Sequence, residues 1–326
     1  MSERVRVLYI AGSGRSGTTV ITTILGQLPG AFAAGELRYL WSRGAVEDHR
    51  CGCGEPFSTC PVWSAVMAEL GTVDAAEAAA IAGRLLRRLR VLRMPLVLGR
   101  RLLGRTPVPP HPDDDRIVAL YRALAEHTGA SVIVDSSKLP PYGLLLQGRP
   151  ELDVRVLHVV RDPRATAFSW RRTKTTQDTD EGTLMPRMEV SKSSLLWLLW
   201  NLLTDAFWPT RRRDVVRFRY EDFVTEPRRH MAEVARLVGL PVEALPFVSE
   251  DEVTLAPTHS VAGNPNRHTT GTVRIRGDME WRAAMPRRDR LVVTALTALG
   301  IARFHYPWAI RSRGPVPSST ESQGAP

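Results

Sequence analysis

The sequence has few cysteines, and it lacks both a long hydrophobic run and an obvious export signal. Its three cysteines all lie between positions 51 and 60, an odd and clustered set that does not support a secreted disulfide framework. The longest uncharged apolar run, 195–203, is too short to cross a bilayer. The N-terminus leads directly into a predicted strand and leaves no room for a signal peptide. We therefore expect a cytoplasmic protein.

Acidic residues are also in deficit. The 326 residues include 44 Lys and Arg but only 34 Asp and Glu, so the formal net charge is +10. Such a chain attracts anionic partners, and charge alone does not choose among a nucleotide, a nucleic acid and a membrane surface. A nucleic acid is disfavoured because no recognisable reading motif is present.

Apolar segments alternate with helical patterns along the chain. Four nearly continuous apolar runs are typical of buried parallel strands: 5–10, 131–134, 154–160 and 215–220. Helical spacing of apolar residues covers 16–28, 75–92, 114–128, 163–172, 190–207, 227–238 and 287–299. This alternation predicts an α/β protein in which helices flank a central parallel sheet in three layers, a P-loop-like fold.

The spacing of these elements also predicts the domain organisation. Residues 1–310 are expected to form a single domain. More than a hundred residues separate the first two predicted strands, so 40–112 should be a helical and loop insertion acting as a lid on the acceptor side. Residues 172–189 are polar and predict a mobile loop, and 311–326 predict a disordered tail.

A glycine-rich loop follows the first predicted strand. Residues 12–19 read Gly-Ser-Gly-Arg-Ser-Gly-Thr-Thr, which fits the spacing of a P-loop except that Thr18 stands where Lys should be. A glycine turn before a helix points backbone N–H groups and the positive end of the helix dipole at an anion. The missing Lys argues against a triphosphate, and the cation stands instead at Arg15.

A second phosphate-binding pattern follows the third predicted strand. In Val160-Arg161-Asp162-Pro163-Arg164, Arg161 ends the strand, and Ser169 lies about two turns into the next helix. Guanidinium groups bind phosphate in a bidentate manner, so Arg161 with Ser169 predicts a second phosphate site.

These two segments resemble those of the sulfotransferases that use adenosine 3′-phosphate 5′-phosphosulfate (PAPS), especially bacterial members and the tyrosylprotein and carbohydrate branches. Further resemblance lies in Tyr220-Glu221-Asp222-Phe223, in 259–267, and in Cys51-Gly52-Cys53-Gly54 with Cys60-Pro61-Val62-Trp63. The matching segments span about residues 5–305 and keep the family's order.

The resemblance implies a PAPS site with two ends. Gly14 and Arg15 and the backbone amides of Ser16, Gly17, Thr18 and Thr19 would hold the 5′ end. At the other end, Arg161 and Ser169 would bind the 3′-phosphate, with Tyr220 packing nearby and Gly263, Asn264 and Arg267 covering it.

Sulfonyl transfer also needs a base and a cation for the leaving charge. Glu36, in Ala34-Gly35-Glu36-Leu37-Arg38, is the expected general base, with His259 as its rival. Arg15 and Lys138 are expected to stabilise the departing phosphate, so that no metal is required. The acceptor would be a hydroxyl, or less readily an amine, of a small molecule, glycan or lipid.

Two other functions are compatible with parts of the sequence. An ATP-dependent small-molecule kinase is suggested by the near-P-loop and by Asp135 after Val132-Ile133-Val134, which resembles a Mg²⁺-binding strand end. A nucleotide-gated binding module is suggested by segment 84–105, which holds eight arginines and no acid. That segment is either a solvated helix or a surface for anionic acceptors or membrane lipid.

The cysteines have two interpretations. With His49 they would make a zinc site, but the Cys-x-Cys spacing without a second pair favours a structured acceptor loop. The sequence leaves the oligomeric state and the acceptor open.

Overall fold

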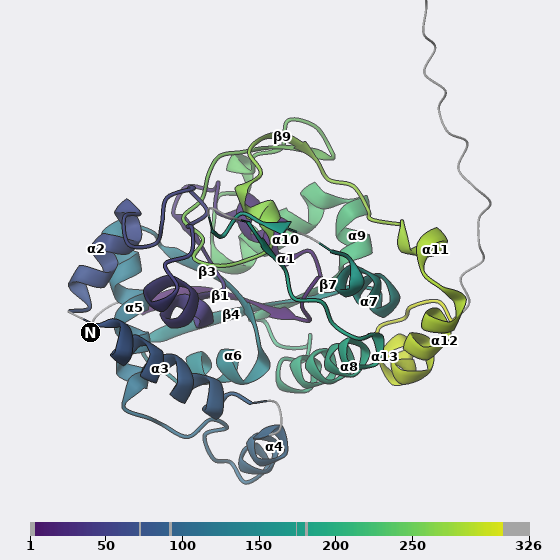
Figure 1. The fold of residues 1–326 in the computed structure, drawn as a ribbon, viewed down its shortest axis with the longest axis horizontal. Coiled ribbons are helices and arrows are strands. Elements are labelled where there is room, and N and C mark those ends of the chain that lie inside the picture. Colours follow the sequence, from purple (N-terminus) through teal and green to yellow (C-terminus); the bar gives the residue numbers. More distant parts are fainter. Residues whose placement is uncertain (1–3, 72, 91–92, 174, 180–181, 309–326) are drawn as a thin grey trace, which may run out of the picture.

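A five-stranded parallel sheet forms the centre of the protein (Figure 1). The structure is a computed structural model and describes residues 4–71, 73–90, 93–173, 175–179 and 182–308. The strand order is β2-β3-β1-β4-β7, with every neighbouring pair parallel. The bounds are β1 Val5–Gly12, β2 Ala31–Gly35, β3 Val132–Lys138, β4 Leu152–Val160 and β7 Val215–Arg219.

Helices cover both faces of the sheet. Alternate side chains of β1 point to opposite faces, and both sets are apolar, so each face must be buried. Val7 and Tyr9 belong to one buried cluster, whereas Leu8 and Ile10 belong to another. The first cluster packs against α5 (Asp113–Thr128), α6 (Pro140–Gln147) and α8 (Val190–Phe207). The second packs against α1 (Thr18–Leu25) and α10 (Pro227–Val238). The predicted three-layer α/β fold is confirmed.

The remaining elements lie around this core. Between β2 and α5 the chain forms η1 (Leu37–Tyr39), the π-helix η2 (Leu40–Val46), α2 (Pro61–Glu69), α3 (Ala75–Arg88) and α4 (Met94–Leu102). Later elements are α7 (Pro163–Arg171), α9 (Tyr220–Thr225), η4 (Val242–Ala244), η5 (Pro265–His268), α11 (Trp281–Ala284), α12 (Arg287–Leu296) and α13 (Ala298–Arg303). Two small antiparallel ladders pair β5 (Thr175–Thr176) with β6 (Thr183–Leu184), and β8 (Glu252–Leu255) with β9 (Gly271–Arg274).

The segment 40–112 forms η2, α2, α3 and α4, and part of it packs against the core helix α5. Its α3 packs against η2, and its α2 packs against α5 (Figure 1). Arg84 and Arg88 form ion pairs with Asp113 and Asp114 at the start of α5. These two ion pairs connect the insertion to the core and already partly compensate the charges of both arginines.

Some expectations differ from the structure. The edge strand β2 was not predicted, because Ala-Phe-Ala-Ala-Gly has little strand propensity and is ordered by its pairing with β3. The predicted mobile loop 172–189 contains the β5–β6 ladder. The predicted tail 311–326 lies outside the described residues. None of the described helices is both long and apolar enough to traverse a bilayer.

The packing of α6 against β1 gives a stability prediction. An added Cβ at Gly143 would lie 2.6 Å from the Tyr9 ring and 2.9 Å from the Trp208 ring. We expect Gly143→Ala to lower the free energy of unfolding by roughly 1–3 kcal/mol through overpacking. The matched control is Gly99→Ala in α4, where nothing lies within 4 Å of the added Cβ. It should stabilise by about 0.5–1 kcal/mol. Urea unfolding of the three proteins measures both effects, and equal values for the two variants would contradict the packing argument.

Candidate functional site

A cavity of about 570 Å³ lies at the carboxyl edge of the sheet. Its wall contains a residue at the end of each of the five strands or directly after it. In the order of the sheet these are Glu36 after β2, Lys138 at the end of β3, Ser13 after β1, Arg161 after β4 and Tyr220 after β7. Parallel α/β sheets bind ligands at this edge, so the topology itself directs these side chains to one place.

The loop between β1 and α1 brings backbone amides to the cavity. Gly17 has a φ of 81°, and a Cβ there would lie 2.2 Å from the Tyr220 ring, so both the turn and the close approach need glycine. Gly14, Arg15, Gly17, Thr18 and Thr19 line the cavity. Ser16 is buried beneath the loop, where its hydroxyl lies 2.9 Å from that of Ser13.

Arg15 is held by contacts on both sides. Its Nη1 donates to Oδ1 of Asn264 at 2.7 Å, and its guanidinium lies 4.7 Å from the centre of the Trp170 ring. Burial lowers its pKa, while the charge of Glu36 opposes that shift. The Nε of Arg15 is buried and has no hydrogen-bond acceptor among the described residues. A buried donor without an acceptor is costly, so this position favours an anionic ligand.

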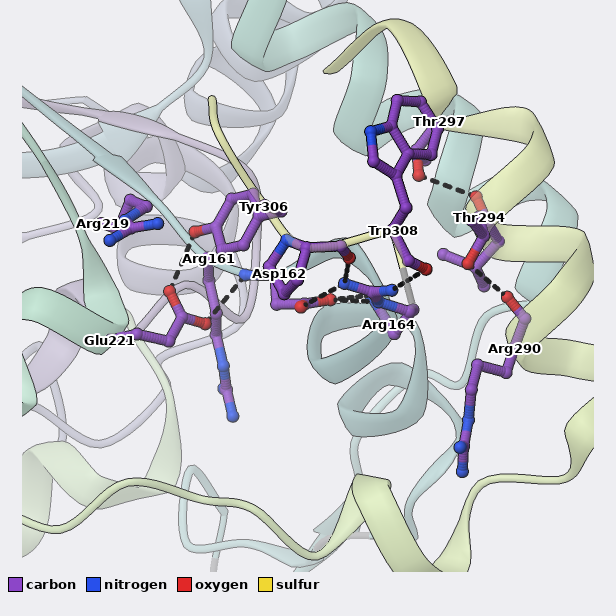
Figure 2. A network of polar contacts seen from close by, with 12 residues as sticks. Arg161, Asp162, Arg164, Arg219, Glu221, Arg290, Thr294, Thr297, Tyr306 and Trp308 are labelled. Carbon is purple, nitrogen blue, oxygen red and sulfur yellow. Dashed lines mark hydrogen bonds and ion pairs between the residues drawn. The ribbon is translucent and has the colours of Figure 1, made fainter. Parts of the chain in front are cut away.

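Arg161 projects from a network of buried polar groups at the end of β4. Figure 2 shows its side chain extending away from Tyr306 and past Glu221. The backbone N–H of Asp162 donates to Glu221 Oε1 at 2.9 Å, and the Tyr306 hydroxyl donates to Glu221 Oε2 at 2.8 Å. Arg161 Nη1 donates to the carbonyl of Arg15 at 3.0 Å. The network thus fixes the strand end that positions Arg161 against the glycine-rich loop.

Helix α7 presents two hydroxyl groups to the same cavity. Asp162 caps this helix by accepting from the N–H of Arg164 at 2.9 Å, and it also binds the Arg164 guanidinium (Figure 2). Ser169 and Thr166 both line the cavity, one turn apart. The Thr166 hydroxyl is buried and has no partner among the described residues. Together with Arg161 these groups offer a compact site for a phosphate.

Glu36 and Lys138 form a largely buried ion pair in the wall of the same cavity. Lys138 Nζ lies 2.6 Å from Glu36 Oε1, and an Arg38 nitrogen lies 3.6 Å from Oε2. Burial alone would raise the pKa of Glu36, but the charges of Lys138 and Arg38 outweigh it and hold that pKa below its ordinary value. Burial lowers the pKa of Lys138, and Glu36 opposes the shift. Glu36 is therefore a carboxylate at neutral pH, as a general base must be.

Three residues singled out in the sequence lie elsewhere. Arg267 is not among the residues of the cavity wall, and its guanidinium binds Asp178 at 2.7 Å. Asp135 is fully buried, where its carboxylate accepts from the Tyr121 hydroxyl at 2.6 Å and from Ser137. His259 lies beside Cys60, with 3.2 Å between Nδ1 and Sγ. The other predicted site residues line the cavity, except Ser16, which is fully buried within the glycine-rich loop.

The family model described as "Sulfotransferase domain" matches residues 6–265, most of the chain. The chain belongs to the sulfotransferase domain family. Such a domain transfers a sulfonyl group, and the protein is a transferase enzyme of this class.

Solved structures share the sulfotransferase fold at low sequence identity. The sulfotransferase domain of the Synechococcus PCC 7002 olefin synthase is 19% identical, with a TM-score of 0.51, over 92% of this chain and 96% of that one. The sulfotransferase domain from the curacin biosynthetic pathway is 15% identical (TM-score 0.48; 94% and 99% covered). A sulfotransferase from Alicyclobacillus acidocaldarius is 13% identical (TM-score 0.43; 94% and 95% covered). No curated protein matches the chain.

Sequence reasoning missed several groups in the wall of this sulfotransferase domain. Thr166 lies three residues before Ser169, so it shares a helix face with Ser169, and that spacing was a usable signal. Trp170 and Asp278 carried no such signal. Trp170 reaches Arg15 only through the packing of α7 on the glycine-rich loop, and Asp278 approaches Arg161 at 3.5 Å from a distant loop.

The Glu221 network predicts a pH-dependent defect. Burial raises the pKa of Glu221, and the hydrogen bond from Tyr306 opposes that shift. Tyr306→Phe removes this donor, so we expect a loss of about 1–3 kcal/mol in the free energy of unfolding at pH 7. Without this hydrogen bond the pKa of Glu221 in the folded variant rises above that in the folded parent protein. As the pH falls from 7 to 5, the folded variant therefore takes up a proton at Glu221 before the parent does, and the loss in the free energy of unfolding should shrink.

Chemical unfolding at both pH values measures this difference between the variant and the parent protein. In a Glu221→Gln background, Tyr306→Phe should show no such pH dependence. A defect of the same size at both pH values in the parent background would contradict the assigned network.

Proposed function

We propose that this enzyme transfers the sulfonyl group of PAPS to a hydroxyl, or less readily an amine, of a small-molecule, glycan or lipid acceptor. The observation that carries the proposal is one cavity whose wall holds two sets of anion-binding groups. The glycine-rich loop with Arg15 is one set, and Arg161 with the hydroxyls of Ser169 and Thr166 is the other. PAPS carries negative groups at two separate positions, on its 5′ and 3′ sides, and so matches this distribution.

The cavity wall supports an anionic ligand in a second way. Arg15 Nε and the Thr166 hydroxyl are buried donors without acceptors among the described residues, and both belong to this wall. The resemblance assigns the 5′ end to Gly14, Arg15, Ser16, Gly17, Thr18 and Thr19, and the 3′-phosphate to Arg161 and Ser169. Tyr220, Gly263 and Asn264 would enclose it. Arg267 would not contact the 3′-phosphate directly. Its hydrogen bonds to Asp178 and to the Arg50 carbonyl would instead hold segment 263–268 in place.

The reaction follows from the charges around Glu36. The carboxylate takes the acceptor's hydroxyl proton as the acceptor oxygen bonds to sulfur, and the bond between sulfur and the bridging oxygen breaks. Adenosine 3′,5′-bisphosphate leaves with the bonding pair. Arg15 and Lys138 stabilise the negative charge that grows on the leaving phosphate, so the proposed step requires no metal. Lys138 would loosen its contact with Glu36 to do so.

The acceptor would enter beside Glu36. The cavity wall also contains Arg38, Tyr39, Arg43 and Trp200. Among the described residues of segment 40–112, only Arg43 lines the cavity. We propose that residues 1–310 act as one domain in the cytoplasm, with 40–112 shaping the acceptor side. A membrane contact through 84–105 has weaker support, because Arg84 and Arg88 already pair with α5.

The ligand test separates the proposal from a kinase. Asp135 is occupied by Tyr121 and Ser137, and Thr18 replaces the P-loop Lys, so neither residue favours Mg-ATP. We expect adenosine 3′,5′-bisphosphate to raise the melting temperature without added Mg²⁺, whereas Mg-ATP should leave it nearly unchanged. Thermal unfolding with each ligand checks this. Stabilisation by Mg-ATP alone would favour the kinase.

The base assignment predicts a separation of binding from turnover. Glu36→Gln should keep affinity for adenosine 3′,5′-bisphosphate but slow transfer by roughly 10²–10⁴-fold, because no group then accepts the proton. The acceptor is first identified by mass spectrometry of sulfo adducts formed from labelled PAPS in an extract of the host. Glu69→Gln, at an exposed position of α2, is the matched control. Full turnover by Glu36→Gln would exclude Glu36 as the base.

The ion pair predicts a shifted pH profile. Lys138 holds the pKa of the buried Glu36 down, so Lys138→Met should raise that pKa. Because Glu36 must be ionised to accept a proton, the acid limb of kcat/KM should move to higher pH in Lys138→Met. Lys192→Met, exposed on α8, should leave the profile unchanged. A lower rate with an unmoved acid limb would show that Lys138 does not set the protonation of Glu36.

A further inference from the structure

All three cysteines converge on one histidine outside the cavity wall. Cys51, Cys53 and Cys60 come from the loop before α2, and His259 comes from the segment after β8, about two hundred positions later in the chain. One potential ligand atom from each residue lies within 4.8 Å of the other three. The partner of the cysteines is therefore His259 and not His49, which had been the candidate from sequence. His49 instead lies against Glu47 and Asp178.

Four of the six distances among these atoms are close to the edges of a tetrahedron around a zinc ion, and the other two are at most 4.8 Å. Ligands at about 2.3 Å for sulfur and about 2.0 Å for nitrogen give edges of about 3.8 Å between sulfurs and about 3.5 Å between sulfur and nitrogen. Cys60 Sγ lies 3.6 Å from Cys51 Sγ and 3.8 Å from Cys53 Sγ. His259 Nδ1 lies 3.2 Å from Cys60 Sγ and 3.9 Å from Cys51 Sγ. Sulfurs in a disulfide lie about 2.05 Å apart, so these spacings describe a ligand cage rather than a bond.

The local sequence is suited to building this cage. The N–H of Gly54 donates to the Cys51 carbonyl at 2.9 Å and closes a tight turn over residues 51–54, which contains the first two cysteines. Gly54 has a φ of 98°, a conformation that favours glycine. A Cβ at Gly52 would lie 2.5 Å from the Thr258 carbonyl oxygen, so glycine lets the loop reach the histidine segment. Trp63 Nε1 donates to the His259 carbonyl at 2.8 Å and holds that residue against α2.

We propose that Cys51, Cys53, Cys60 and His259 bind one structural Zn²⁺ ion. A set of three thiolates and one imidazole is typical of closed structural zinc sites, in which the protein supplies all four ligands and no position is open to substrate. Cys51 and Cys60 are buried, whereas Cys53 and His259 are half-buried, so the ion can enter from one side. The inference concerns folding and does not depend on the identity of the sulfonyl donor.

The ion would join two distant segments behind the cavity. The N–H of Gly52 donates to the Ser260 carbonyl at 3.0 Å, and that of Glu36 donates to the Ala262 carbonyl at 3.0 Å. Asn264, two residues further on, accepts from Arg15. Zinc at His259 would thus fix the start of a segment that supports both Glu36 and Arg15.

Metal analysis of the full-length protein tests the proposal directly. The protein is purified without a histidine tag or chelator, and its zinc content is measured by mass spectrometry alongside thiol titration. We expect about one zinc per chain and three thiols that react only after denaturation or chelation. Co²⁺ exchanged into the site should show thiolate-to-cobalt charge transfer and the intense visible bands of tetrahedral coordination.

Two single variants, each of which removes one proposed zinc ligand, test whether the metal binds at this cluster. Cys53→Ser and His259→Gln should each reduce affinity for Zn²⁺ by more than roughly tenfold, and Zn²⁺ should then raise their melting temperatures less than that of the parent protein. His127→Gln, exposed at the end of α5, should retain the metal. Metal-free parent protein with three freely reactive thiols, or with two thiols lost to a disulfide, would overturn the proposal. So would zinc content unchanged in both ligand variants.

Discussion

Buried positive charge at the carboxyl edge of the sheet is the constraint around which this structure is organised. Arg15, Lys138 and Arg161 all approach one cavity from strand ends or from the loop after β1, and each is partly or fully withdrawn from water. Withdrawing a cation from water is costly unless it finds a partner. Lys138 finds Glu36, and Arg161 finds Asp278 and the Arg15 carbonyl, but the Nε of Arg15 has no acceptor among the described residues. The incomplete pairing favours an anionic ligand at this edge, and this is one basis of the proposed sulfonyl donor.

The same charges determine how Glu36 behaves. A carboxyl buried alone would become a weak acid and hold its proton at neutral pH. Next to Lys138 and Arg38 its pKa is held below the ordinary value, so the proposed base stays ionised although it is largely buried. The ion pair is a resting arrangement, because the proposed transfer needs Lys138 at the leaving phosphate. Binding of the donor would weaken the hold of Lys138 on Glu36 and make the carboxylate more basic as the acceptor arrives.

Much of this edge could be predicted from sequence because parallel sheets gather the ends of their strands. The apolar runs that became β1, β3, β4 and β7 put Arg15, Lys138, Arg161 and Tyr220 at or after strand ends, and the family resemblance supplied their expected roles in one site. Strand β2 was missed because its order comes from pairing with β3, which local propensity does not encode. Trp170 and the Glu221–Tyr306 network depend on tertiary packing in the same way, and so does the meeting of His259 with the cysteines.

Segment 259–264 connects the cysteine cluster, strand β2 and the glycine-rich loop, which lie far apart in the sequence. Its start lies in the cysteine cluster, its middle pairs with β2 through the N–H of Val261 and the carbonyl of Ala34, and its end accepts a hydrogen bond from Arg15. The proposed zinc at His259 would add one more fixed point to these contacts, so less entropy would be lost when the proposed donor binds. The cysteine loop, although outside the cavity wall, would therefore contribute to donor affinity by holding in place the residues that cover it.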